Sequence, residues 1–247
     1  MTGGLCKNNM NKNKDIFTKL LICDQSTVIL PKQAAQILSV SEQERLVNIS
    51  HPQQAQLFLL GRYLTRHLLA STLQLAPEQI NITVDANGKP LLADAGYHFN
   101  ISHSGTLLAL AVSNQGSVGV DIEGRQLKPA QIQRLAKRYF SINEQIWLAK
   151  HPSAANFLQL WTVKEAVVKA AGTGLANQLQ QVQWQPQQAH AALLQQHYRL
   201  YQYQVAQSWL TLAVSGKPAL APQAILLSDV CSALEITAPQ PNLTVNP

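Results

Sequence analysis

Strand-rich sequence in the middle of the chain, with helical sequence on both sides of it, constrains the fold most. Three short apolar or alternating segments, Tyr97–Ile101, Leu107–Val112 and Ser117–Glu123, are separated by Ser/Gly and Asn-Gln-Gly breaks, which predicts three strands. Helical patterns precede and follow them, and alternation returns within Val182–Val214. The order strand, helices, strands, helices, strands predicts an α+β fold of two similar halves that meet near Asn114–Ser117.

Patterns outside the middle segment predict the remaining elements. The expected helices are Pro31–Leu38, Ser41–Asn48, Gln53–Leu75, Pro129–Phe140, Asn143–His151 and Ala154–Ala171. The further expected strands are Thr18–Leu30 and Ile80–Val84. Ser41 followed by Glu44 matches a capping box at the start of the second helix. Asn87-Gly88 predicts a turn.

The length and composition allow a sizeable core. The 247 residues suffice for one large domain or two smaller ones, and 46% of them are hydrophobic. The polar Asn/Lys sequence of residues 1–15 predicts a disordered start, and the Pro/Asn-rich residues 232–247 predict a flexible tail. We therefore expect a first α+β half over residues 16–115 and a second over residues 116–231.

The charge balance favours an anionic partner. Lys and Arg number 19 against 13 Asp and Glu, which gives a net charge of +6. Such a balance suits nucleic acid, a phosphorylated metabolite, an acidic protein or a membrane surface. The longest apolar run, Leu107–Val112, is far shorter than the roughly 18 residues of a membrane span. No long apolar segment follows the Lys/Asn-rich start, so we expect a cytoplasmic protein without a secretory signal.

The segment Val118–Glu123 has the clearest chemical potential. On a strand, its valines and Ile122 share one face, while Gly119, Asp121 and Glu123 share the other. The two carboxylates then stand side by side and can converge on one hard cation, and the glycine leaves room for a close approach. A solvent-facing acidic edge is the ordinary interpretation of an isolated Asp-x-Glu.

The expected helix Ala154–Ala171 carries a second polar row. Trp161, Glu165 and Lys169 follow one another at a spacing of four residues, which places them on one face. A surface Glu–Lys pair is the alternative, but the surrounding valines leave little of this helix to face water. A shared polar cleft is the interpretation that we favour.

A third segment, Phe99–Gly105, runs from strand sequence into small residues. Ser102, His103, Ser104 and Gly105 could offer hydroxyls, an imidazole and backbone N–H groups to an anion. A solvated turn is the alternative for this segment taken alone.

Together the segments resemble the Sfp-type 4′-phosphopantetheinyl transferases. The resemblance covers residues from about 39 to 215 and includes five motifs in the family's order. The motifs are Gly88-Lys89-Pro90, Phe99-Asn100-Ile101-Ser102-His103-Ser104-Gly105, Gly119-x-Asp121-x-Glu123, Trp161-x-x-Lys164-Glu165-x-x-x-Lys169 and Gly172-Thr173-Gly174.

The resemblance implies a reaction and a fold. Members transfer the 4′-phosphopantetheine group of coenzyme A to a serine of a carrier protein, release 3′,5′-ADP and require Mg²⁺. Members of this length are monomeric pseudo-dimers of two α+β halves with the active site in the cleft between them. Carried over by motif, Asp121, Glu123 and Glu165 would hold the Mg²⁺ ion.

The resemblance also implies residues that contact coenzyme A. Ser102 and His103 would contact its pyrophosphate, and Lys164 would anchor the same group or pack the cleft. Lys169 would stabilise or protonate the departing phosphate. The 3′-phosphate would meet Lys89 beside Pro90, with Arg45 and Arg62 as further cations. Many members carry an arginine shortly before the Leu-Gly pair, where this chain has Gln56-Leu57-Phe58.

Three groups are candidates for the general base. Glu165 is the choice that we favour, and a metal-bound water and Glu144 are the alternatives.

The resemblance also implies a partner. Carrier proteins are acidic, and Lys128, Arg134, Lys137 and Arg138 could attract one, with Phe140 as an apolar anchor. A fatty-acid, polyunsaturated-fatty-acid, polyketide or nonribosomal-peptide synthase could supply that carrier.

Two other functions fit the sequence less well. A nucleic-acid-binding module is disfavoured because aromatic residues are few and do not interleave with Lys and Arg. Another Mg²⁺-dependent phosphotransferase could use the same carboxylates, but Walker-type and GxGxxG motifs are absent from the sequence.

Overall fold

The structure, a computed structural model, describes residues 16–85, 88–93, 96–174, 178–227 and 244–245. The disorder expected for residues 1–15 lies outside the described residues, and so does most of the expected flexible tail. Asn87 of the expected turn lies outside them as well. Gly88 of that turn has a φ of 80°, a left-handed conformation that glycine adopts readily.

Helices and strands alternate in the expected manner, and the α+β class is confirmed. The helices are α1 (Val40–Val47), α2 (Pro52–Leu73), α3 (Pro129–Tyr139), α4 (Ile142–Lys150) and α5 (Ala154–Ala171), with 3₁₀ turns at Ala34–Ile37, Pro77–Gln79 and Leu179–Gln181. The strands are β1 (Thr18–Asp24), β2 (Ile82–Val84), β3 (Pro90–Leu92), β4 (His98–Ser104), β5 (Leu107–Ser113), β6 (Val118–Glu123), β7 (His190–Leu193), β8 (Gln196–Val205), β9 (Ser208–Ser215), β10 (Gln223–Leu227) and β11 (Thr244–Val245).

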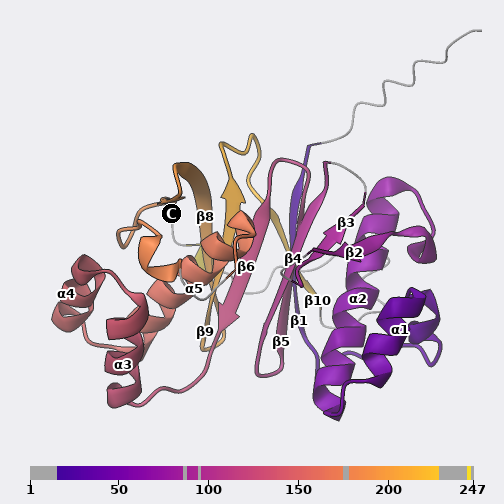
Figure 1. The fold of residues 1–247 in the computed structure, drawn as a ribbon, viewed down its shortest axis with the longest axis horizontal. Helices are drawn as coiled ribbons and strands as arrows, with labels where there is room; N and C mark the ends of the chain where they lie inside the picture. Colours follow the sequence, from indigo (N-terminus) through magenta and orange to yellow (C-terminus); the bar gives the residue numbers. More distant parts are fainter. Residues whose placement is uncertain (1–15, 86–87, 94–95, 175–177, 228–243, 246–247) are drawn as a thin grey trace, which may run out of the picture.

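Two sheets face each other, and the long helices cover their outer sides (Figure 1). The first sheet has the order β10-β1-β5-β4, and the second has the order β11-β8-β9-β6 with β7 beside β8. α2 packs on the first sheet, and α5 packs on the second. A further core lies between the two sheets. Its buried members are Leu20, Ile22, Ala109, Ala111, Val118, Val120, Ile122, Tyr203, Leu210, Leu212 and Val214.

The apolar run of β5 is explained by burial on both faces. Leu108 and Leu110 point into the core under α2, whereas Ala109 and Ala111 point into the core between the sheets. A strand that is covered on both sides needs apolar residues at every position, so the alternation disappears.

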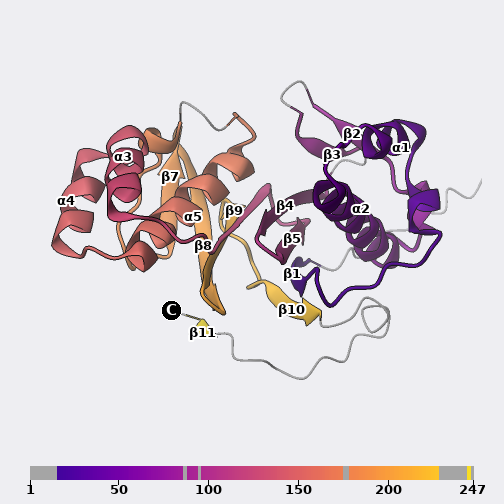
Figure 2. The same ribbon diagram turned by 90° about the horizontal axis from the view of Figure 1, so that it is seen from below.

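Strand β10 crosses between the halves. It follows β9 in the chain and lies within the expected second half of residues 116–231, but it pairs in parallel with β1 of the first sheet. Figure 2 shows β10 in yellow beside the indigo β1. The two sheets are therefore linked by an exchanged strand as well as by a shared core.

Local hydrogen bonds shift several expected boundaries. The capping box of α1 is made by Ser39 and Glu42, not by Ser41 and Glu44. β1 ends at Asp24 because the carboxylate of Asp24 accepts hydrogen bonds from the Ser26 N–H and hydroxyl and closes a turn there. The helix expected over Pro31–Leu38 forms only a short 3₁₀ turn.

Within the described ranges, no helix combines the length and the apolar character that crossing a membrane would require.

Candidate active site

The site is built where α5 packs on the outer face of β6. Gly119 allows this contact, because a Cβ atom added there would lie 2.1 Å from the carbonyl oxygen of Ala166. The close approach brings the polar row of α5 over the carboxylates of β6. Together they form a pocket of about 300 Å³ lined by Ile101, Ser102, His103, Asp121, Ile122, Glu123, Arg125, Trp161, Glu165 and Lys169.

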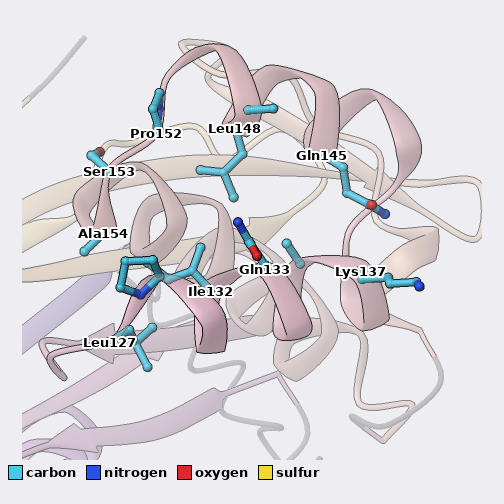
Figure 3. A pocket seen from close by; sticks show the side chains of 12 residues that line it. Leu127, Ile132, Gln133, Lys137, Gln145, Leu148, Pro152, Ser153 and Ala154 are labelled. Carbon is cyan, nitrogen blue, oxygen red and sulfur yellow. The ribbon is translucent and has the colours of Figure 1, made fainter.

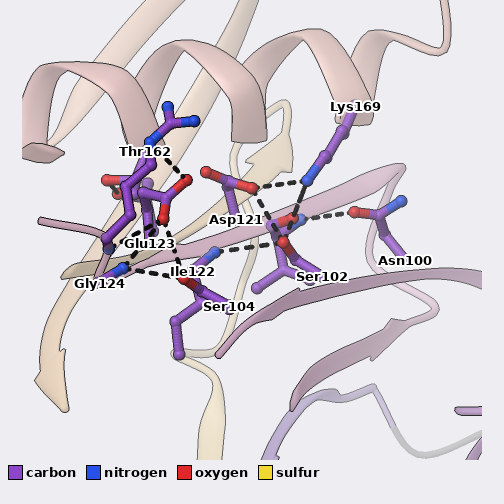
Figure 4. A network of polar contacts seen from close by, with 12 residues as sticks. Asn100, Ser102, Ser104, Asp121, Ile122, Glu123, Gly124, Thr162 and Lys169 are labelled. Carbon is purple, nitrogen blue, oxygen red and sulfur yellow. Dashed lines mark hydrogen bonds and ion pairs between the residues drawn. The ribbon is translucent and has the colours of Figure 1, made fainter. Parts of the chain in front are cut away.

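Asp121 and Lys169 form the closest charged pair of the pocket. The Lys169 ammonium donates to Asp121 Oδ1 at 2.6 Å and also to Ser102 Oγ at 3.2 Å (Figure 4). Burial raises the pKa of the Asp121 carboxyl, and the Lys169 charge opposes that rise. The ammonium of Lys169 is therefore the charged partner of a carboxylate that is almost completely buried.

Glu165 lies one helical turn before Lys169. Burial, reinforced by the negative charge of Asp121, raises the pKa of Glu165 to about 7. Within the described part of the chain, its carboxylate accepts no hydrogen bond. Such a group changes its protonation state near neutral pH, which is what a general base at that pH requires.

Glu123 is held by several donors at the end of β6. Its Oε1 accepts hydrogen bonds from the Ser104 hydroxyl at 2.9 Å and from the N–H groups of Gly124 and Arg125. Its Oε2 lies 3.2 Å from Arg125 Nε, and the Arg125 guanidinium lies over the Trp161 ring. The carboxylate therefore has one oxygen tied to the chain and one turned to a partly exposed cation.

The three carboxylates do not form a closed metal cage. Among the described residues, no three His, Cys, Asp or Glu side chains converge on a single point. Mg²⁺ is usually held by one or two carboxylates and completes its shell with water and substrate phosphate. The donor chemistry of Asp121 and Glu123, with Glu165 facing the same pocket, fits an ion of that kind.

Strand β4 is longer than the sequence predicted, because a strand was expected to end at Ile101 and to be followed by a loop. The strand continues through Ser102-His103-Ser104, and the turn begins only at Gly105, whose φ is 58°. His103 and Ser102, the expected phosphate contacts, both line the pocket. Ser102, however, donates its proton to Asp121 Oδ1 at 2.9 Å, so its hydroxyl is used within the protein.

The hairpin β2–β3 reaches the end of α5. Lys89 Nζ donates to the Lys169 carbonyl oxygen at 2.5 Å and lies close to Gly172. Burial lowers the pKa of Lys89. The cation expected beside Pro90 thus stands next to the pocket, at the glycine-rich end of the helix.

Lys164 and Glu144 do not line the pocket, which corrects two expectations. Lys164 Nζ lies 2.9 Å from Glu144 Oε2 and donates to the carbonyl oxygens of Leu179 and Val182. Both side chains are buried, and Glu144 also closes the capping box of α4 with Ser141. Adjacent residues of a helix point in different directions, so Lys164 faces Glu144 of α4 while its neighbour Glu165 faces the pocket.

Arg62 is also removed from the set of free cations. Its Nε lies 2.9 Å from Glu42 Oε1, and Arg66 binds the other oxygen of Glu42 at 2.5 Å. Arg62 is buried, so the expected phosphate contact would require this pair to open. Arg45 stays exposed and lies over the Phe58 ring.

Two neighbours of the carboxylates were missed from the sequence. The sequence patterns give Arg125 no role, although it lies two residues beyond Glu123, the last residue of β6. Ser104 was considered only as a loop hydroxyl. Its spacing of two from Ser102 would have placed both on the same side of an extended β4.

A second hollow lies away from the carboxylates, between α3 and α4 (Figure 3). It encloses about 600 Å³, and Ile132 and Leu148 point toward each other across it. Phe140, expected as an apolar anchor, is buried in a cluster with the rings of Phe157 and Trp161 and cannot serve as one.

Comparison with known proteins places the chain in a family. A model of the 4′-phosphopantetheinyl transferase superfamily matches residues 117–221, and one described as "4′-phosphopantetheinyl transferase, N-terminal" matches residues 30–115. A Synechocystis protein provisionally named a 4′-phosphopantetheinyl transferase, slr0495, is 35% identical over 170 residues, which cover 66% of this chain and 68% of the relative. The chain belongs to the Sfp-type 4′-phosphopantetheinyl transferases.

Other relatives of this transferase match over a smaller share of their length. The 4′-phosphopantetheinyl transferase Sfp of Bacillus subtilis is 34% identical over 143 residues, or 56% of this chain and 62% of the relative. The human L-aminoadipate-semialdehyde dehydrogenase-phosphopantetheinyl transferase is 30% identical over 63% of this chain and 56% of the relative. The chain thus spans about half to two thirds of the length of the relatives that it matches.

Proposed function

We propose that this transferase moves the 4′-phosphopantetheine group from coenzyme A to a serine of an acidic carrier protein, with Mg²⁺, and releases 3′,5′-ADP. One observation carries the proposal. Asp121, Glu123, Glu165 and Lys169, which come from β6 and α5, line a single pocket with Ser102 and His103 of β4. Such a pocket offers both a cation site and donors for phosphate oxygens.

Asp121 and Glu123 are the residues that would hold Mg²⁺, with Glu165 facing it. Burial and, after it, the negative charge of Asp121 raise the pKa of Glu165, and a cation among the carboxylates would oppose both effects. When bound, the ion neutralises charge on the pyrophosphate and on the departing phosphate.

Glu165 is the general base of the proposed reaction. The acceptor serine oxygen forms a bond to the phosphorus that bears the pantetheine arm, and the bond from that phosphorus to the leaving 3′,5′-ADP breaks. The serine proton passes to the Glu165 carboxylate, which a neighbouring cation would keep ionised and able to accept it. Glu144 is excluded from our proposal because it is buried against Lys164.

The cations of the pocket act on the leaving group. Lys169 exchanges its bond to Asp121 for one to the departing phosphate and stabilises or protonates it. His103 contacts phosphate oxygens from the edge of the pocket. Lys89 of the β2–β3 hairpin, which contacts the end of α5, binds the 3′-phosphate together with the exposed Arg45.

The two halves form a pseudo-dimer with the active site in the cleft between them. In each half a capping-box glutamate pairs with a buried cation of the following long helix: Glu42 with Arg62, and Glu144 with Lys164. The second pair lies 102 residues beyond the first at both positions. The same offset relates β5 to β9 to within one residue, which supports an internal repeat.

The carrier docks beside α3. Arg134, Lys137 and Arg138 are exposed on that helix and can attract an acidic surface. The hollow between α3 and α4 replaces Phe140 as the apolar part of the contact.

Mass spectrometry of carrier proteins tests the proposal. We expect one phosphopantetheine group to be added to a carrier by the purified chain with coenzyme A and Mg²⁺, and none when the acceptor serine is alanine or Mg²⁺ is chelated. Asp121→Ala should abolish transfer, and Glu165→Gln should abolish transfer while Mg²⁺ still binds. Full transfer by Glu165→Gln would remove Glu165 as the base.

A further inference from the structure

Strands β4 and β6 are the facing edges of the two sheets, and side chains join them. In the described part of the chain, no main-chain ladder links these two strands. Instead, Asn100 Oδ1 accepts a hydrogen bond from the Val120 N–H at 2.9 Å, and Ser102 Oγ accepts one from the Ile122 N–H at 3.3 Å. We call Asn100, Ser102 and Ser104 the seam.

Ser104 makes the third bond of the seam. Its Oγ accepts from the Gly124 N–H at 3.0 Å (Figure 4). All three seam residues alternate along β4, and their partners alternate along β6 with the same period. The seam therefore fixes both the spacing and the register of the two edge strands.

The seam also determines where the serine protons point. A hydroxyl has one proton, and each seam serine already accepts a backbone N–H. Its proton is then free for a carboxylate: Ser102 donates to Asp121 Oδ1, and Ser104 donates to Glu123 Oε1, both at 2.9 Å. Each carboxylate of β6 is thus oriented by one serine of β4.

We propose that Ser104 is a positioning residue for Glu123, acting through the seam. The inference rests on the proposed function, because it assigns Glu123 to the cation. Ser102 lines the pocket and also accepts a hydrogen bond from Lys169. Ser104 does not line the pocket, and the only pocket carboxylate to which it is hydrogen-bonded among the described residues is Glu123. Groups that orient a metal-binding carboxylate typically change metal affinity or activity by about 10- to 100-fold when they are removed.

The test compares Ser104→Thr with Ser104→Val. These side chains have nearly the same shape and both suit a strand, so they differ in the hydroxyl alone. Ser104→Ala is a second hydroxyl-free variant in case valine does not fold. Ser71→Ala is the matched control, because Ser71 donates to the Leu68 carbonyl oxygen within α2.

Two measurements are made on the full chain. Hydrogen exchange by NMR reports the Gly124 amide, and calorimetry with coenzyme A present reports Mg²⁺ affinity. In Ser104→Val the Gly124 N–H loses Ser104 Oγ, and Glu123 Oε1, which shares that N–H, loses the hydroxyl that holds it in place. We therefore expect Gly124 exchange to become faster and Mg²⁺ affinity to fall about 10-fold or more. Ser104→Thr and Ser71→Ala should stay within about threefold of the parent in both measurements.

The outcomes separate the two proposals. If the parent binds Mg²⁺ and Ser104→Val equals Ser104→Thr in both measurements, the positioning role is wrong and the proposed function stands. A Gly124 amide that exchanges freely in the parent also overturns the inference. A parent that binds no Mg²⁺ with coenzyme A overturns the proposed function, and the inference with it.

Discussion

At the scale of single residues, identical side chains acquire different chemistry from their neighbours. Lys164 and Lys169 lie on the same helix, but one is buried against Glu144 and the other reaches Asp121 in the pocket. Glu165 forms no such ion pair with any residue that the structure describes, and burial raises its pKa to about 7. The same helix therefore carries a structural cation, a cleft cation and a carboxylate that titrates near neutral pH.

The raised pKa of Glu165 predicts a pH-dependent stability. Between pH 4.5 and about 7 the folded state keeps a proton that the unfolded state has lost, so the free energy of unfolding falls as pH rises. The Glu165 contribution is at most about 3 kcal/mol. Urea unfolding with Mg²⁺ chelated should show that the free energy of unfolding falls less between pH 4.5 and about 7 in Glu165→Gln than in the parent. Equal slopes for the two proteins would contradict the assignment.

At the scale of elements, the site depends on how closely α5 approaches β6. That approach needs a residue without a side chain at position 119, because the backbone of Ala166 and Ala170 occupies the space. The buried pair of Lys164 and Glu144 then ties the other side of α5 to α4. Both contacts fix the distance between the polar row of α5 and the carboxylates of Asp121 and Glu123 on β6.

Gly119→Ala should separate α5 from β6. We expect a loss of about 3 kcal/mol in the free energy of unfolding and at least a 10-fold loss of transfer, because backbone atoms cannot move aside. Gly61→Ala is the control, since its Cβ would meet only the flexible end of Ile101 at 3.3 Å. That variant should stay within about 1 kcal/mol of the parent. A Gly119→Ala protein of parental stability and activity would refute the close packing.

Lys164→Met should leave the Glu144 carboxylate buried without its cation. We expect a loss of about 3–5 kcal/mol in the free energy of unfolding, measured with urea. The double variant Glu144→Gln/Lys164→Met should recover most of that loss and keep transfer within about threefold of the parent. Loss of transfer in a stable double variant would restore Glu144 as a candidate for the base.

At the scale of the whole molecule, the two sheets share a core, β10 returns to pair with β1 of the first sheet, and the pocket is lined by residues of β4, β6 and α5. The net charge of +6 is available for long-range attraction of an acidic partner. Exposed cations on α3 give that attraction a location. Because such attraction acts through solvent, it weakens as salt is added.

Charge reversal separates local docking from net charge. Arg134→Glu/Arg138→Glu should raise KM for the carrier at least about fivefold and leave KM for coenzyme A unchanged. Lys32→Glu/Lys217→Glu changes the net charge equally at exposed positions elsewhere and should affect the carrier less. Equal effects of the two pairs would show that only net charge matters.

The amino-acid sequence by itself determined the class of fold, the polar face of β6 and the row Trp161, Glu165 and Lys169 on α5. These depend on periods of two and of about four residues, which are local properties of a chain. Only the tertiary structure decided which charges pair in the interior. Arg62 and Lys164 carry the kind of cation that could bind phosphate. Each is instead buried in an ion pair with a glutamate, Glu42 or Glu144, that lies 20 residues earlier in the chain. The same holds for Ser104 and for β10, because a hydrogen bond between two edge strands, or a strand that returns to the first sheet, depends on contacts between distant parts of the chain.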